Sequence, residues 1–212
     1  MNVFVLNTGR CGSTTFIQAC KHITNYSCAH ESRSAMLGEE RLDYPVNHIE
    51  ADNRLSWLLG RLDQKYGNDA FYVHLMRNKK DTARSFTKRY SSGIIKAYRG
   101  DGILMGLPET IDSMAVSLDY CDTINTNIYL FLKDKSKKII INLENIDQGF
   151  AEFWNLINAE GDLSAALAEL KINYNATKLY QEGESNQRRL FQRIAGKLKK
   201  VVFMLPGFIK NA

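Results

Sequence analysis

The chain begins with a run of apolar residues that leads through a glycine-containing loop into a helical pattern. After Asn2, every residue up to Leu6 is apolar, which is typical of a strand buried on both faces of a sheet. The loop contains glycines, and from Ser13 to His22 the apolar residues fall on one side of a helix. Because such a strand needs cover on both faces, this order predicts a layered α/β structure.

The same alternation recurs along the chain. Apolar runs predict further buried strands at residues 70–76 and 138–143, and helical spacing predicts helices at residues 54–66, 79–90, 109–132, 150–157 and 163–170. Strands that alternate with helices predict an α/β fold with a parallel β-sheet flanked by helices on both faces. In such sheets, ligands bind beyond the carboxyl ends of the strands.

Composition limits the number of domains and the classes of partner. The 212 residues are 44% hydrophobic, enough for one well-buried core. Residues 186–212 hold seven of the 28 Lys and Arg residues and none of the 23 Asp and Glu residues, so the first 185 residues carry 21 basic against 23 acidic side chains, a net −2. We therefore expect an α/β domain over residues 1–185 and a separate basic segment over 186–212, and nucleic acid is not an expected partner of the body.

The basic segment has the spacing of an amphipathic helix between Gln187 and Leu205. Docking on the body or on a second subunit of a homo-oligomer, peripheral contact with an anionic membrane surface, and nucleic-acid contact all remain open for it. No apolar run approaches the roughly 20 residues of a membrane span. The N-terminal residues lack the pattern of a secretory signal. We expect a cytoplasmic protein, with peripheral membrane location as the alternative.

The loop after the first strand, Asn7 to Thr15, has the composition of an anion site. Glycines let backbone N–H groups point inward, the helix N-terminus adds partial positive charge, and Arg10 adds a full charge. The kinase-type phosphate loop and the dinucleotide motif G-x-G-x-x-G are both absent. A Cys-phosphatase loop would need Arg six residues after Cys11, where Ile17 stands, so Cys11 is not expected to be a nucleophile. An ordinary strand-to-helix turn capped by Ser13 is the alternative.

Two segments resemble the sulfotransferases that use 3′-phosphoadenosine 5′-phosphosulfate (PAPS). Arg10-Cys11-Gly12-Ser13-Thr14 resembles that family's 5′-phosphosulfate loop, [KR]-[SC]-G-[ST]-[ST], in the Arg form typical of the branch acting on sugars and protein tyrosines. The family's 3′-phosphate motif is a strand that ends in Arg, with a Ser eight residues later, and it is matched by Arg77 and Ser85. Residues 139–146 resemble, more weakly, a strand ending in an acidic turn. The resemblance runs in order across about residues 1–160.

The resemblance implies a P-loop, nucleotide-kinase-like sulfotransferase fold. It also implies metal-independent transfer of a sulfuryl group from PAPS to an acceptor hydroxyl. A bidentate guanidinium and a hydroxyl suit a dianionic phosphate. The donor-binding residues implied are Gly9, Arg10, Cys11, Gly12, Ser13, Thr14, Thr15, Arg77 and Ser85, and Lys178 is the candidate for a third cofactor contact.

Sulfuryl transfer also needs charge neutralisation at the leaving phosphate and a base for the acceptor proton. Arg10 fits the first role. Glu31 resembles the catalytic Glu of the sugar and tyrosine branch, and His48 resembles the His of the phenol and steroid branch. Glu31 is preferred over His48, with His30 third, although Glu31 could instead pair with Arg33 and His48 could cap a strand.

The sequence does not identify the acceptor. We expect a small-molecule, sugar or lipid-like hydroxyl compound, bound by residues 32–44 and by residues 91–108, a glycine-rich segment expected to be a long surface loop or a lid. The competing function is a nucleotide-binding module without turnover, located by its basic tail at a membrane or a partner.

Overall fold

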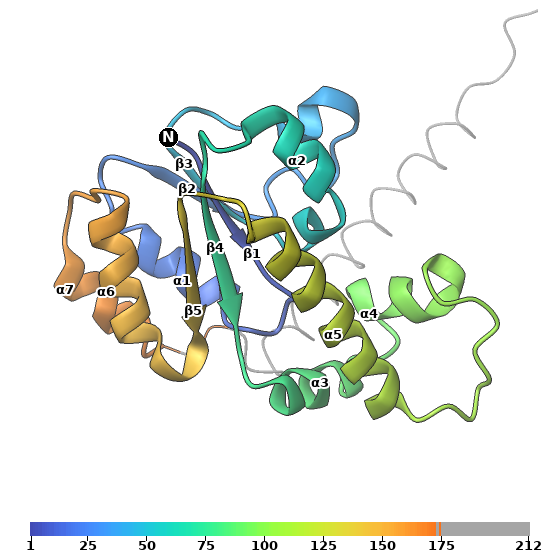
Figure 1. The fold of residues 1–212 in the computed structure, drawn as a ribbon. Coiled ribbons are helices and arrows are strands. Elements are labelled where there is room, and N and C mark those ends of the chain that lie inside the picture. Colours follow the sequence, from blue (N-terminus) through green and yellow to red (C-terminus); the bar gives the residue numbers. More distant parts are fainter. Residues whose placement is uncertain (173, 175–212) are drawn as a thin grey trace, which may run out of the picture. The chain divides into compact units, whose positions relative to one another are not determined.

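The computed structural model describes residues 1–172 and residue 174, and residues Met1–Ile172 form one compact unit. Its strands form a single sheet in the order β2-β3-β1-β4-β5, and every neighbouring pair is parallel (Figure 1). The strands are β1 (Val3–Leu6), β2 (Ser27–His30), β3 (His48–Ala51), β4 (Phe71–Met76) and β5 (Lys138–Asn142). The predicted α/β fold is confirmed. Two of the strands, β2 and β3, were not expected.

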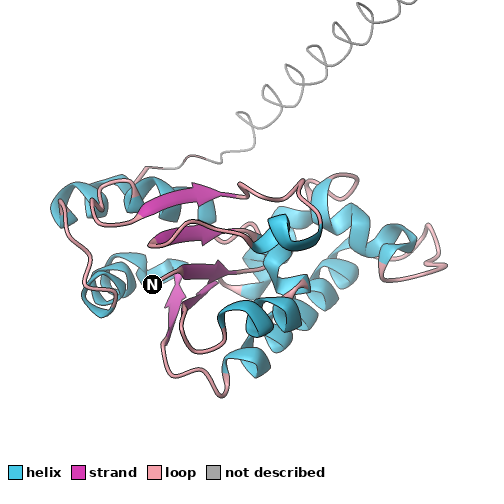
Figure 2. Ribbon diagram, turned by 90° about the horizontal axis from the view of Figure 1, so that it is seen from above, coloured by secondary structure: helices cyan, strands magenta, loops and turns pink. Residues whose placement is uncertain are grey.

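Helices cover both faces of the sheet, which lies between two helical layers (Figure 2). The α-helices are α1 (Ser13–Cys20), α2 (Leu59–Tyr66), α3 (Lys79–Thr87), α4 (Gly93–Ala97), α5 (Ser113–Leu132), α6 (Ile146–Leu156) and α7 (Leu163–Glu169). Short 3₁₀ or π turns are η1 (Gly38–Leu42), η2 (Asn53–Trp57), η3 (Tyr98–Gly102) and η4 (Leu143–Asn145).

Strand alternation divides the apolar side chains into two cores. On β1, Val3 and Val5 pack into the core under α1, α6 and α7, while Phe4 and Leu6 pack into the core under α2 and α5. All four side chains are fully buried, as the continuous apolar run predicted. The middle strand is thus covered on both sides, and its carboxyl end opens into the glycine loop.

Several boundaries differ from the prediction for identifiable physical reasons. Residues 91–108 are not a long loop throughout, because α4 and η3 bury Ile95 and Tyr98 in the core. The helix expected at residues 54–66 is divided into η2 and α2. β5 was expected to be buried, but as an edge strand it exposes Ile140 by 52% and buries Ile139 and Ile141.

Some predictions concern residues outside the part that the structure describes. They are the boundary at residue 185, the basic amphipathic segment and Lys178. Among the described residues, no helix combines the length and the apolar character needed to span a bilayer.

Candidate functional site

The loop between β1 and α1 adopts the curved backbone expected of an anion cradle. Gly9, Arg10 and Gly12 have left-handed φ angles of 82°, 62° and 89°. A Cβ at Gly9 would stand 2.7 Å from Asn53 Nδ2, and one at Gly12 would stand 2.6 Å from Leu143 Cδ1. Both positions favour glycine because of their left-handed φ, and the loop lies close to side chains from the elements that follow β3 and β5.

Hydrogen bonds from buried side chains hold the start of this loop. The Asn7 amide donates to the Val5 carbonyl at 2.9 Å, and its oxygen accepts from the Gly9 N–H at 2.8 Å. The Tyr120 hydroxyl on α5 donates to the Thr8 carbonyl at 2.7 Å. The cradle is consequently pre-organised by groups that lie beneath it.

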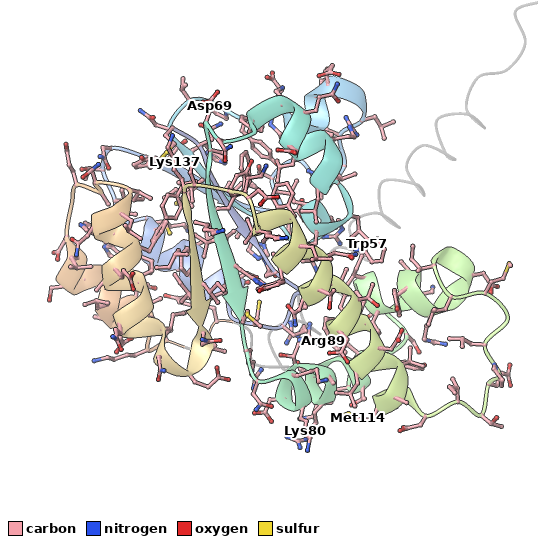
Figure 3. The ribbon with its side chains drawn as sticks, viewed as in Figure 1. Trp57, Asp69, Lys80, Arg89, Met114 and Lys137 are labelled. Atoms are coloured by element: carbon pink, nitrogen blue, oxygen red, sulfur yellow. The ribbon has the colours of Figure 1, made fainter. Side chains whose placement is uncertain are left out.

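The two predicted halves of the donor site meet at the carboxyl end of the sheet. Arg10 Nε donates to Ser85 Oγ on α3 at 3.0 Å. Arg77, which directly follows β4, donates from Nη1 to the Arg10 carbonyl at 3.3 Å. Arg77 and Ser85, which lie 67 and 75 positions after Arg10 in the sequence, thus contact it directly. In Figure 3, Lys80 marks this end of the molecule, and Asp69 and Lys137 mark the opposite end.

The remaining loop residues have different environments. Burial raises the pKa of Cys11 to about 12, although backbone N–H groups and Arg10 act in the opposite direction, so the thiol stays protonated at neutral pH. Ser13, the first residue of α1, hydrogen-bonds to His30 at 3.0 Å. Thr14 is half-buried near the start of α1. The Thr15 hydroxyl donates to the Ile172 carbonyl at 3.4 Å, and the structure therefore directs this hydroxyl away from the cradle.

Glu31 lies at the same end of the sheet, directly after β2, with a left-handed φ of 52°. Its Oε2 is 2.8 Å from Arg54 Nη1, and both side chains are about one-third exposed. The partner of Glu31 is therefore Arg54 and not Arg33, which instead donates to the Glu40 carbonyl at 2.8 Å. The pair lies beside the cradle, because Asn53, the neighbour of Arg54, packs on Gly9.

Asp52 connects this pair to the interior. Its carboxylate accepts from the Arg54 N–H at 2.8 Å and from Arg41 Nη2 at 2.6 Å. Burial raises the pKa of the fully buried Asp52 above its ordinary value, while the contacts with Arg54 and Arg41 act in the opposite direction. Asp52 is the N-cap of η2, and its ion pair with Arg41 joins this cap to η1.

The structure does not bring His48 to the cradle. His48 begins β3 and lies beside Asn2, whose side chain accepts from the His48 N–H. The chain from Asn2 to Asn7 is extended, so His48 lies about 16 Å along the sheet from Asn7. Its imidazole is buried between Glu50 at 3.0 Å and Ser27 at 2.8 Å. Both ring nitrogens are therefore engaged in a network under β2 and β3.

His74 and Glu144 have structural contacts. His74 Nε2 lies 3.1 Å from Asn125 Oδ1, and burial lowers the pKa of this histidine, as expected for a hydrogen-bonded core histidine. Glu144 lies in the acidic turn after β5, the segment that resembles the family more weakly. It accepts from the Asn78 N–H at 2.8 Å and thereby joins the ends of β4 and β5.

Sequence reasoning missed several residues that shape this site. Tyr120 has a hydroxyl bond to the loop, and Asn53 packs on Gly9. His30 was a candidate base, but its contact with Ser13 was not foreseen. The polarity of Tyr120 within an apolar helical stripe was the available signal for the first. The other two depend on which strands are neighbours, and the sequence did not determine the sheet order.

Together these residues form a site that can bind an anionic ligand and accept a proton. Arg10, Arg54 and Arg77 supply cationic groups around curved backbone, and Ser13 and Ser85 supply hydroxyls. Glu31 is the carboxylate at the rim. Guanidinium groups and hydroxyls bind phosphate or sulfate groups, and a partly exposed carboxylate can remove a proton. We name this set the carboxyl-end site.

The fold is similar to that of a solved sulfotransferase domain. The sulfotransferase domain from the curacin biosynthetic pathway aligns with a TM-score of 0.55 and 14% identity, over 81% of this chain and 77% of that one. No protein-family model matches the sequence, and no curated protein matches it. The sulfotransferase-like fold is thus established by structure, with little sequence identity.

Proposed function

We propose that the chain is a sulfotransferase that moves a sulfuryl group from PAPS to an acceptor hydroxyl. The observation that carries the proposal is the meeting of Arg10, Ser85 and Arg77 at one end of the sheet. These residues were selected from two separate sequence motifs, and they are in hydrogen-bond contact within a sulfotransferase-like fold. Arg10, together with Glu31 after β2, favours the branch acting on sugars and protein tyrosines.

The donor side of the site fits an adenosine derivative with phosphate groups at both ends. The left-handed backbone at Gly9, Arg10 and Gly12 forms the cradle for the 5′ group, and Arg77 with Ser85 forms the site for the 3′-phosphate. PAPS supplies the activated sulfuryl group when it is bound. Arg10 neutralises negative charge on the leaving phosphate, which is the main electrostatic requirement of this transfer.

For the base we propose Glu31. Its carboxylate is partly exposed, lies at the carboxyl end of the sheet and is oriented by Arg54. His48 is buried and engaged at both nitrogens at the level of Asn2. Glu31 therefore takes the proton from the acceptor hydroxyl, and His48 serves the structure. The acceptor class stays the one inferred from sequence, a small-molecule, sugar or lipid-like hydroxyl compound, and the location that we propose is cytoplasmic.

The first test is calorimetric titration of the full chain with 3′-phosphoadenosine 5′-phosphate, with adenosine 5′-phosphate as the matched control. We expect the 3′-phosphate to strengthen binding by at least about tenfold, since it adds charge-assisted hydrogen bonds. Equal affinity for the two nucleotides, or no binding of either, would overturn the proposal.

The second test separates an enzyme from a binding module. The chain is incubated with PAPS and a panel of hydroxyl acceptors, and release of 3′-phosphoadenosine 5′-phosphate is measured. Acceptor-dependent release is expected of the enzyme. Tight nucleotide binding without release for any acceptor class would instead support the module without turnover.

A further inference from the structure

We propose that His30 is a positioning residue of the anion cradle, which makes the Ser13 hydroxyl a hydrogen-bond donor to the bound 5′ group. This inference rests on the proposed function. It assigns a role to a histidine that is not the preferred base, and the contact that suggests it is His30 Nε2 to Ser13 Oγ at 3.0 Å.

The backbone around His30 fixes this contact. His30 is the last residue of β2 and lies opposite Ala51 of β3, and the following N–H of Glu31 donates to the Ala51 carbonyl at 3.0 Å. Side chains alternate along a strand, so His30 lies on the same face as Cys28. Cys28 packs against α1, where its Sγ is 3.7 Å from the Ile17 carbonyl. The imidazole is thereby directed to the first turn of α1.

The chemistry of a hydroxyl determines what this contact does. Ser13 has one proton to donate, and its oxygen can also accept. When that proton is donated to an anion, the oxygen is free to accept from His30, and a neutral imidazole can donate from Nε2 only in the Nε2–H tautomer. A donor behind the hydroxyl polarises it and strengthens its bond to the anion. His30 thus commits Ser13 to face the cradle as a donor.

A pair of substitutions separates this role from general packing. His30→Leu removes the donor, whereas His30→Gln keeps an N–H group at a similar reach. We expect His30→Leu to weaken calorimetric binding of PAPS by about tenfold, because it removes one hydrogen bond and no longer holds the Ser13 hydroxyl as a donor to the anion. His30→Gln is expected to restore affinity to within about threefold of wild type. Equal affinity of His30→Leu and wild type, or failure of His30→Gln to restore it, would overturn the inference.

The chain offers a matched control beside the same helix, α1. His22 Nε2 lies 3.5 Å from Glu169 Oε2, next to the other end of α1. His22→Leu removes a histidine contact of similar exposure and is expected to leave PAPS affinity unchanged. If His22→Leu weakened binding as much as His30→Leu, the effect would come from displacement of α1, and the positioning role would be wrong.

A double-mutant cycle tests the pathway through Ser13. Ser13→Ala is expected to cost at least as much as His30→Leu, because it also removes the hydroxyl that donates to the anion. The double variant is expected to bind about as weakly as Ser13→Ala, because without that hydroxyl His30 has nothing to position. Losses that multiply in the double variant would show that His30 acts independently of Ser13, which contradicts the inference.

A spectroscopic measurement on the wild-type chain does not depend on whether a variant folds. Long-range ¹H–¹⁵N correlation reports the tautomer of each histidine, and saturation with 3′-phosphoadenosine 5′-phosphate is expected to place a proton on His30 Nε2. Nucleotide binding with Nε2 unprotonated would overturn this inference and leave the proposed function intact. Absence of any nucleotide binding would instead overturn the proposed function.

Discussion

Two sets of charged residues lie next to each other on and beyond β3, and they differ in exposure. His48, Glu50 and Asp52 occupy alternate positions of the strand and its extension, and all three are buried with partners. Arg54 follows two residues later and pairs with Glu31, with both side chains about one-third exposed. The first set, which we call the buried row, satisfies its own charges, whereas the second can exchange its partners with a ligand.

The difference teaches which charged groups in this fold have a structural role and which are available for chemistry. Glu50 accepts from His48, from the Ser32 N–H at 2.8 Å and from the Ser32 hydroxyl at 2.6 Å. A substrate could reach this carboxylate only after those bonds had broken. Changes in the buried row should therefore alter stability, and changes in the carboxyl-end site should alter binding or turnover.

The largest effect is expected from Arg41→Met, which leaves Asp52 buried without its guanidinium. We expect the free energy of unfolding at pH 7 to fall by about 3 kcal/mol, the cost of an uncompensated buried charge. Because burial raises the Asp52 pKa, the carboxyl loses its charge as the pH falls through that raised value, and the deficit relative to wild type should be smaller at an acidic pH than at pH 7.

Urea unfolding of both proteins at the two pH values measures this deficit. The control is Arg61→Met, since Arg61 is exposed and its removal leaves no buried charge. A deficit that grew as the pH fell would contradict the assignment to Asp52.

The next effect is expected from Glu31→Gln, which keeps the shape of the side chain and removes the base. Turnover with an acceptor found by the screen should fall by about 100-fold, with affinity for 3′-phosphoadenosine 5′-phosphate unchanged. His48→Gln should leave turnover of the folded enzyme near wild type. The reverse pattern, in which His48→Gln abolishes turnover and Glu31→Gln does not, would overturn the division between the buried row and the site.

Arg77→Ala should weaken binding of 3′-phosphoadenosine 5′-phosphate by about 30-fold, or about 2 kcal/mol, because a guanidinium leaves the 3′-phosphate site. Arg84 on α3 is the matched control, since its side chain is 63% exposed and pairs with Asp81 at 2.6 Å. Calorimetry should give Arg84→Ala an affinity close to wild type. Equal losses for both variants would indicate a general effect of positive charge.

The smallest effect is expected from Ser27→Ala, which removes the partner of His48 Nδ1 at the start of β2. We expect a loss of about 1 kcal/mol or less in the free energy of unfolding, because Ser27 is exposed and water can replace its hydroxyl. Nucleotide affinity should not change. A binding defect in this variant would link the buried row to the site and weaken the comparison.

The sequence predicts part of the sheet well because β1 and β4 are apolar at nearly every position. It fails for β2 and β3 because their sequences, SCAH and HIEA, carry polar residues. In β3, His48 and Glu50 are buried through partners on other segments, which an apolar pattern cannot reveal. His48, a candidate base because it resembles the His of the phenol and steroid branch, becomes a structural residue in our proposal.

The same limit applies to the site. Arg10, Arg77 and Ser85 could be found because they belong to two local motifs at strand ends. Asn53 meets the cradle because β3 lies next to β1, and His30 meets Ser13 because β2 runs beside β3. These contacts depend on sheet order, and no local spacing of residues determines that order.

The left-handed backbone at two site residues has a consequence for directed evolution of this protein. Outside the glycines of the described chain, positive φ occurs at three Asn or Asp residues, which tolerate it, and at Arg10 and Glu31, which do not. Selection for heat resistance alone should therefore favour glycine at both positions. A library screened in that way would become enriched in more heat-stable variants that have lost the charged side chains of Arg10 and Glu31, which we propose to drive the reaction.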